Sequence, residues 1–140
     1  MSLLGAVQTY LKTYSELADG APVWVDFLGS DGTQYSVIPL PGARIISEDI
    51  IGNTEREFPF AFQSMESTAD DLERLETAGF YESFADWLES QSKAGTFPTL
   101  ETGQTATKIE STGWAFLYEQ GVSDTGIYQI QCKLTYEQEA

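Results

Sequence analysis

A nine-residue stretch near the middle of the chain, REFPFAFQS at residues 56–64, alternates large apolar side chains with smaller or polar ones. Phe58, Phe60 and Phe62 fall on one side of an extended backbone, and the residues between them fall on the other. A period of two is that of a β-strand with one face sealed against something apolar. Such a row could be core or docking surface. Burying one large apolar side chain contributes roughly 2 kcal/mol, and helices elsewhere can cover the row, so we predict core.

Pro59 sits inside this strand and has no amide hydrogen to give to a sheet ladder. The strand is therefore expected at a sheet edge or to carry a bulge. An edge can recruit another chain, which makes the side of the strand opposite the phenylalanines, and the edge around Pro59, a candidate partner surface.

Apolar residues spaced three and four apart predict an amphipathic helix over residues 2–19, begun by Ser2 and ended by Gly20. A second helix is predicted from Thr68, where Thr68 and Asp71 resemble a capping box with acidic residues near the positive end of the helix dipole. A kink or short break is expected at Gly79. Residues 92–105 follow as a polar connection with Gly and Pro, interpreted as a mobile surface loop.

Most of the remaining chain consists of runs rich in β-forming residues. PVWVDFL (22–28) and TQYSVIPL (33–40) flank a GSDG turn and are predicted to form an antiparallel hairpin. ARIISEDII (43–51) meets TEREFPFAFQSMES (54–67) across Gly52-Asn53, a dipeptide suited to a two-residue loop, which completes a meander of four strands. Two closing runs, 107–119 and 126–137, predict a last hairpin.

These elements predict the α+β class, with a largely antiparallel sheet built from a strand meander and a C-terminal hairpin. Two main helices pack on the sheet, in the order α-β-β-β-β-α-β-β. A length of 140 residues fits a single domain, 1–140, that buries roughly two-thirds of its unfolded surface.

Charge restricts the ligands that the chain can bind. Seven Lys and Arg against 22 Asp and Glu give a net charge of −15, and 41% hydrophobic residues indicate a folded acidic protein rather than a disordered tail. Phosphate binding needs clustered cations, so duplex DNA or RNA is not an expected partner, although mimicry of nucleic acid stays open.

Cys132, the only cysteine, lies in an alternating apolar run and is predicted to be a buried thiol. The first 20 residues lack the basic start and continuous apolar stretch of a signal peptide, and no run approaches 18 apolar residues. We therefore expect the chain to be cytosolic where it is made, with no membrane partner.

The absence of histidine removes the commonest general base and the commonest zinc ligand. The carboxylates of Asp70, Asp71, Glu73 and Glu76 have helix-surface spacing and are interpreted as a solvated face rather than an acid/base pair or metal ligands. The GSDG and VSDTG turns carry one acid each, and neither is a phosphate-binding loop followed by lysine. We predict no catalytic, cofactor-binding or metal-ligating residue.

Six residues form the candidate interface with an oligomer or another partner, and the competing interpretation is a plain solvated face. They are the polar side of the strand around Pro59 and of the last strand: Glu57, Pro59, Gln63, Gln129, Gln131 and Lys133.

Three segments together resemble the small tail-terminator or minor capsid (tail-completion) proteins of long-tailed phages and prophages. The segments are REFPFAFQSMESTADD (56–71), GFYESFADWLESQSKAGTFPTL (79–100) and GIYQIQCKLTYEQ (126–138). The similarity runs from about Val23 to Gln138. It is carried by a phenylalanine-rich strand, a helix with a Phe-Tyr and a Trp-Leu pair, and the final YQIQCKLTY strand, none of which is a catalytic signature.

The resemblance implies a non-enzymatic protein that caps the tail tube, ends its polymerisation and forms the tail side of the head-tail joint, as a hexameric ring. It implies three partners: further copies of the chain, the tail tube protein, and a head-completion or connector protein. It implies no cofactor, and a location in the host cytoplasm during assembly and then in the virion tail or neck. Only regions 56–64, 80–88 and 127–136 match as structural elements, and the match assigns no ring contact.

Two other classes stay open at this stage. An acidic inhibitor that mimics nucleic acid would bind a basic protein with strong salt dependence, although the acids are spread from Glu16 to Glu139. A carboxylate-dependent hydrolase would need two acids converging in a cleft, one of them with a raised pKa.

Overall fold

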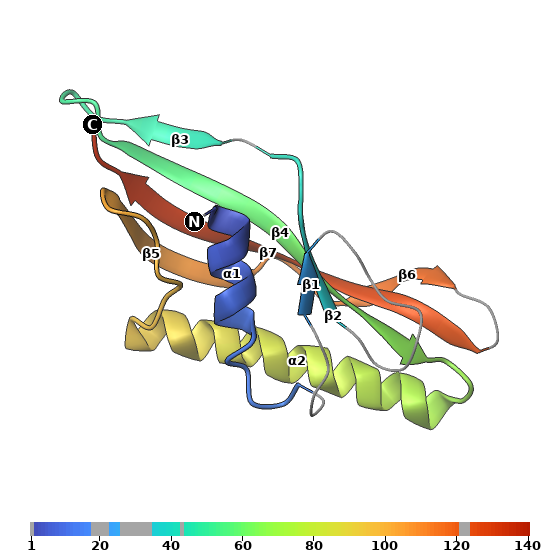
Figure 1. Cartoon of the computed structure of the whole chain (residues 1–140). Coiled ribbons are helices and arrows are strands. Elements are labelled where there is room, and N and C mark those ends of the chain that lie inside the picture. The colour runs from blue at the N-terminus through green and yellow to red at the C-terminus, as the bar shows by residue number, and fades with distance from the viewer. Residues whose placement is uncertain (1, 18–22, 26–34, 43, 121–123) are drawn as a thin grey trace.

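Two 14-residue antiparallel strands, β4 (Thr54–Ser67) and β7 (Thr125–Gln138), pair along their whole length and form the central ribbon of the molecule (Figure 1). The structure, a computed structural model, describes residues 2–17, 23–25, 35–42, 44–120 and 124–140. Its class is α+β, as predicted: the described residues form two helices and a sheet of seven mostly antiparallel strands.

Shorter strands pair along both edges of this ribbon, two to an edge. β2 (Tyr35–Pro39) and β3 (Ile45–Glu48) pair end to end with β4, and β1 (Val23–Val25) pairs with β2. β5 (Gln104–Ser111) and β6 (Phe116–Gln120) pair end to end with β7. The first four strands are therefore not a meander, because β2 and β3 share one edge of β4.

Both helices, α1 (Leu3–Leu11) and α2 (Asp71–Ala94), cover the same face of the ribbon. Phe60 and Phe62 point into this layer and are fully buried, and Phe58 is half-buried against it. The Phe62 ring packs 4.6 Å from Phe84 of α2. The phenylalanine row is therefore core, as predicted.

Pro59 does not mark a sheet edge, because β4 has partners on both sides. The Pro59 nitrogen faces the edge of β4 that β2 and β3 share. At Pro59 that edge has no ladder partner, because β2 ends at Pro39 and β3 starts only at Ile45. The Pro59 carbonyl, on that same side, accepts from Leu40 N at 2.9 Å. The prediction of an edge strand was wrong, since a gap between two end-to-end neighbours also tolerates a proline.

β1 and β2 pair in parallel, which contradicts the predicted antiparallel hairpin. Strand direction depends on the path of the connecting residues, which alternation does not encode. The GSDG segment lies outside the described residues. The β3–β4 hairpin does form, but over a longer loop than predicted, because the Asp49 carboxylate accepts from the backbone of Ile51 and Asn53, at 3.0 Å each.

The helices also differ from the prediction at their ends. α1 stops at Leu11 because Thr13 N and Thr13 Oγ1 both donate to Tyr10 O and tighten the chain into turns; Gly20 lies outside the described residues. α2 begins one residue after Asp70, whose side chain caps Glu73 N at 2.9 Å, and it runs unbroken through Gly79. The predicted cap at Thr68 and break at Gly79 were therefore wrong.

The C-terminal part has three strands where two were predicted. Residues 112–115 separate β5 from β6, and Thr112 N donates to Gln131 O at the junction. The connection between α2 and β5 is anchored rather than free: Phe97 and Leu100 pack on the core, and Tyr10 Oη donates to Thr96 O at 2.8 Å.

Phe62→Ala is expected to lower the free energy of unfolding by about 3–5 kcal/mol, because it leaves a cavity among the rings of Tyr35, Tyr81 and Phe84. Urea denaturation followed by circular dichroism measures the loss. Leu72→Ala, on an exposed position of α2, is the control and should change stability by less than about 0.5 kcal/mol. Equal effects of the two substitutions would contradict the assignment of Phe62 to the core.

Candidate functional site

The structure gathers the six predicted partner residues on one face of the central ribbon, opposite the helices. We call this the outer face. Pairing aligns β4 with β7 so that Glu57, Pro59 and Gln63 lie beside residues of β7 with the same orientation. The cross-strand neighbours are Glu57 with Thr135, Pro59 with Lys133, Ala61 with Gln131, and Gln63 with Gln129.

The six residues differ in how far a partner could reach them. Gln63 and Gln129 are buried and bonded to each other, Nε2 to Oε1, at 2.8 Å. Glu57 and Lys133 form an ion pair at 3.6 Å with partly exposed side chains. Pro59 is half-buried and Gln131 is exposed. Only the end of the outer face that carries Glu57, Gln131 and Lys133 offers polar groups to a partner.

The outer face also contains aromatic residues that the prediction missed. Trp24, Ser36, Gln63, Gln129 and Phe116 lie in one row across five strands. Trp24 is 41% exposed and Phe116 is 43% exposed. Their places follow from the pairing of β1 with β2 and of β6 with β7, which the sequence pattern alone did not give.

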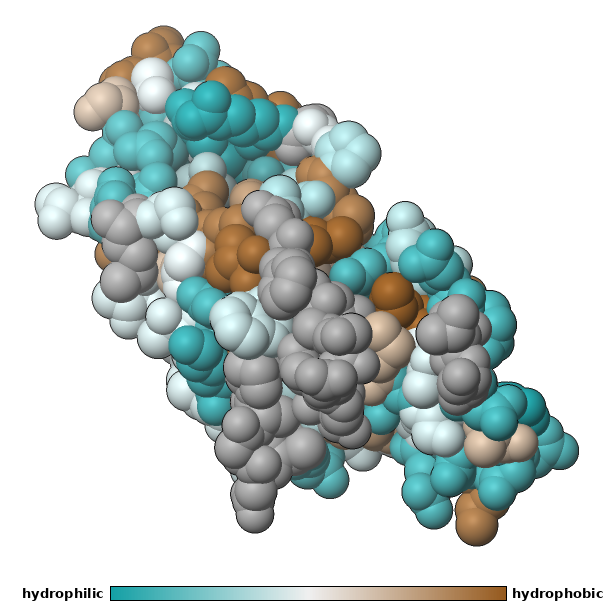
Figure 2. All heavy atoms as spheres, turned by 45° about the vertical axis from the view of Figure 1, so that its right-hand side comes forward, coloured by the Kyte–Doolittle hydropathy of each residue, from teal (hydrophilic) through white to brown (hydrophobic). Residues whose placement is uncertain are grey.

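Exposed apolar side chains gather in two patches at opposite ends and edges of the ribbon. Among the described residues, eleven large hydrophobic side chains are exposed, and eight of them belong to these patches. The hairpin patch, at the β3–β4 hairpin, consists of Ile45, Ile46, Ile50 and Ile51. The β6 patch consists of Trp114, Phe116, Leu117 and Tyr118. Figure 2 shows hydrophobic atoms at the upper-left end of the molecule, where the β3–β4 hairpin lies in Figure 1.

A groove of about 790 Å³ runs between α2 and β5, with Trp114 at its lining. Both lysines of its lining form ion pairs, Lys93 with Glu89 at 3.2 Å and Lys108 with Glu110 at 2.7 Å, while Glu82 and Asp86 add two further acids. Ser92 Oγ donates to Ile109 O and accepts from Ile109 N, at 2.6 and 2.9 Å. The α2 helix thereby closes the outward edge of β5 at its centre.

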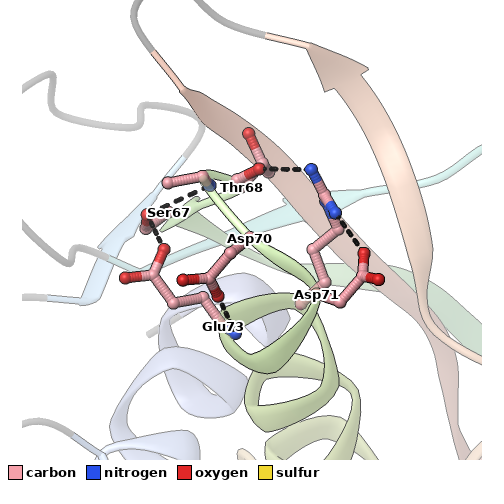
Figure 3. A network of polar contacts seen from close by, with 7 residues as sticks. Ser67, Thr68, Asp70, Asp71 and Glu73 are labelled. Carbon is pink, nitrogen blue, oxygen red and sulfur yellow. Dashed lines mark hydrogen bonds and ion pairs between the residues drawn. The ribbon is translucent and has the colours of Figure 1, made fainter.

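The carboxylates at the start of α2 serve the helix end, as Figure 3 shows. Asp70 caps Glu73 N, and the Glu73 side chain accepts from Ser67 Oγ. Arg74 pairs with Asp71 at 2.6 Å and donates to Thr68 O at 2.7 Å. Asp70 thus satisfies one unpaired amide, and Asp71 and Glu73 lie in the first turn, near the positive end of the helix dipole, which is a structural role.

One acid beside this network is buried enough for its ionisation to change. A hollow of about 360 Å³ has four glutamates on its wall, Glu16, Glu66, Glu73 and Glu76. Burial raises the pKa of the Glu66 carboxyl, and a hydrogen bond from Ser64 opposes that shift. Within the part of the chain that the structure describes, no group of three or more acids, Cys or His is placed to hold a metal ion.

Cys132 lies under the helices on the opposite face from Gln131 and is fully buried, as predicted. Burial raises the pKa of its thiol well above the ordinary value. A thiol that stays protonated is a poor nucleophile, so this side chain belongs to the core.

Comparison with models of known protein families finds no match, and comparison with curated protein sequences finds none either. No helix within the described residues is long and apolar enough to cross a membrane.

The Gln63–Gln129 hydrogen bond is open to a direct test. Gln63→Leu leaves the Gln129 amide buried without its partner and should cost about 1–3 kcal/mol of stability, whereas Gln63→Leu with Gln129→Leu should recover most of the loss. Urea unfolding of the four proteins of this cycle measures the coupling. Gln131→Leu, on the same face but exposed, is the control. A single variant as stable as the wild type would show that the pair is solvated and reachable.

Glu66→Gln should stabilise the protein at pH 7. The folded-state pKa of Glu66 lies above its unfolded value of about 4.3, so ionisation of this carboxyl opposes folding once the pH exceeds the folded pKa. As the pH falls through that pKa the wild type regains the stability, and below about pH 4 the two proteins should agree. Thermal unfolding between pH 3.5 and pH 7 measures this, with exposed Glu76→Gln as control. A stability difference that does not vary with pH would contradict it.

Proposed function

We propose that the chain is a virion assembly protein of a long-tailed phage or prophage. In this role it caps the tail tube, ends tube polymerisation and forms the tail side of the head-tail joint, without catalysis. The proposal rests on the resemblance of residues 56–71, 79–100 and 126–138 to tail-terminator and minor capsid proteins.

The observation that carries the proposal is the pair of apolar patches on separate edges. Monomeric proteins seldom expose several large apolar side chains close together unless these contact something. Here the hairpin patch and the β6 patch hold eight large side chains, at opposite edges of one sheet. Two different patches per copy favour head-to-tail contacts, which generate rings when the rotation closes.

The charges fit partners made of protein rather than nucleic acid. Arg74, Lys93, Lys108 and Lys133 each pair with a carboxylate of the same chain. Against a net charge of −15, this leaves few cations for phosphate groups. The proposed partners are further copies of the chain in a hexameric ring, the tail tube protein, and a head-completion or connector protein. The proposed location is the host cytoplasm during assembly and later the virion tail or neck.

The same charge sets the conditions for a ring. Six copies at −15 each repel one another over about 10 Å at 0.1 M salt. We therefore expect the free protein to be mostly monomeric at low salt and the ring to form on a tube with complementary charge. Rings that persist in dilute low-salt buffer would contradict this part of the proposal.

A second candidate is an acidic module that binds or inhibits a basic protein. The observation in its favour is the exposed side of α2, where Asp71, Glu76, Glu82, Asp86 and Glu89 all face solvent. Such a module would bind its partner with a strong dependence on salt.

Deletion of the gene in an inducible lysogen distinguishes the two. Electron microscopy of the induced particles should show overlong tails of variable length, detached from filled heads, because nothing stops the tube or joins it to the head. A plasmid carrying the wild-type gene should restore normal virions, and the empty plasmid is the control. Normal virions from the deletion strain would contradict the assembly role and favour the acidic module.

A further inference from the structure

Two strands of the sheet are left with an apolar and exposed edge. All four residues of β3 and all five of β6 are exposed. Within the described residues, β3 pairs only with β4, and β6 pairs only with β7. An exposed edge strand offers unpaired amides and carbonyls on which another strand can add. Natural proteins usually protect such edges with charges, prolines or a covering element.

The edge of β5, the strand that pairs with β7 end to end with β6, is protected by a covering element. Ser92 of α2 bonds to both the amide and the carbonyl of Ile109 and so occupies the middle of the β5 edge. β3 and β6 instead carry Ile45, Ile46, Leu117 and Tyr118, which are 43–58% exposed. α2 therefore covers the edge of β5, whereas β3 and β6 have no covering element among the described residues. Each of the two has one register shift, at Ile45/Ser47 and at Leu117/Glu119, and each bears one of the apolar patches.

The open edges are compatible in direction. β3 runs antiparallel to β4, β4 to β7, and β7 to β6. β3 and β6 therefore run in opposite directions within one molecule. A second copy, shifted along the strands and across the sheet without being turned over, brings its β3 beside β6 as an antiparallel neighbour.

The side chains are compatible as well. Ser47 pairs with Glu55 and Phe116 pairs with Gln129, so both lie on the outer face. If Ser47 of one copy is set opposite Phe116 of the next, Arg44 falls opposite Glu119. The same register sets Ile45 and Ile46 opposite Tyr118 and Leu117, and directs the hairpin tip with Ile50 toward Trp114. Two pairs within the strands are then apolar on both sides, Phe116 faces Ser47, and the cation Arg44 meets the anion Glu119.

We propose that copies of this chain join head to tail by pairing β6 of one copy with β3 of the next. The contact extends the antiparallel sheet from copy to copy and covers the hairpin patch with the β6 patch. It is heterologous, so it can close a ring. This inference specifies the contact between copies and rests on the proposed function only for the size and place of that ring.

Disulfide trapping tests the contact. Ser47→Cys and Phe116→Cys proteins, prepared separately and mixed in about 0.5 M NaCl to screen repulsion, should form a mixed dimer under mild oxidation. Opposed residues of antiparallel strands have Cα atoms about 4.5–5.5 Å apart, which suits a disulfide. The buried Cys132 does not compete. The variant with both cysteines should give a ladder longer than a dimer on a non-reducing gel.

The control mixes Ser47→Cys with Glu76→Cys, an exposed position on α2, and should give at least tenfold less mixed dimer. Failure of the Ser47–Phe116 mixture to exceed this control overturns the proposal. So does a preference of either variant for pairing with itself, which would indicate a twofold contact instead.

A charge exchange gives a second test that leaves the core untouched. Arg44→Glu and Glu119→Arg should each reduce the oligomer seen by sedimentation velocity at high protein concentration in about 0.5 M NaCl, and the double variant should restore it. Lys12→Glu and Glu76→Arg, matched changes at exposed positions of the helical layer, should leave the oligomer unchanged. Equal losses in test and control variants, or no rescue by the double variant, overturn the contact.

These experiments use the isolated protein and are independent of phage assembly. A trapped β3–β6 contact together with normal virions from the deletion strain would leave the contact in place and remove the tail role. Overlong tails from the deletion strain without any trapped contact would support the tail role and overturn the β3–β6 contact.

Discussion

The pairing of β4 with β7 is the interaction on which the rest of the structure depends. Fourteen consecutive residue pairs, from Thr54 with Gln138 to Ser67 with Thr125, form a ribbon with which every other strand except β1 pairs directly. One face of the ribbon is apolar and must be shielded from water. It carries the buried side chains of Phe60, Phe62, Ile130 and Leu134. The two helices follow from it, since each covers part of this apolar row. A one-residue slip of the register would move the row to solvent.

The long ribbon also explains why the functional hypothesis concerns edges rather than a cavity. Each of the two long strands has room for two short neighbours placed end to end. The gaps between those neighbours absorb irregularities such as Pro59, and the outermost strands end the sheet. Ser92 closes one of these edges by bonding to Ile109. Asp70 and Asp71 serve the start of α2, and Glu89 and Glu110 in the groove are paired with lysines.

The sequence allowed prediction of the features that depend on strand alternation and turn chemistry, but not of where the helices begin, end or break. The α+β class, the burial of Phe60, Phe62 and Cys132, and the hairpin at Gly52-Asn53 all follow from alternation or turn chemistry. Strand partners did not follow, because the parallel pairing of β1 with β2 is decided by the path between them. The six candidate interface residues share one face, as their alternation implied, yet Gln63 and Gln129 are buried against each other. Trp24 and Phe116 were missed because only the pairing of β1 with β2 and of β6 with β7 places them on the outer face.

Charge and apolar surface set opposing demands on this chain, and their balance argues for conditional assembly. A contact between the hairpin patch and the β6 patch joins two short strands, so in isolation it gains little beyond a few pairs of apolar residues. The net charge of −15 per copy opposes that gain wherever screening is weak. A template that holds copies side by side raises their effective concentration and removes much of the entropic cost of association. A small contact on an acidic subunit is therefore suited to forming on a template, and without one it needs high salt and a high protein concentration.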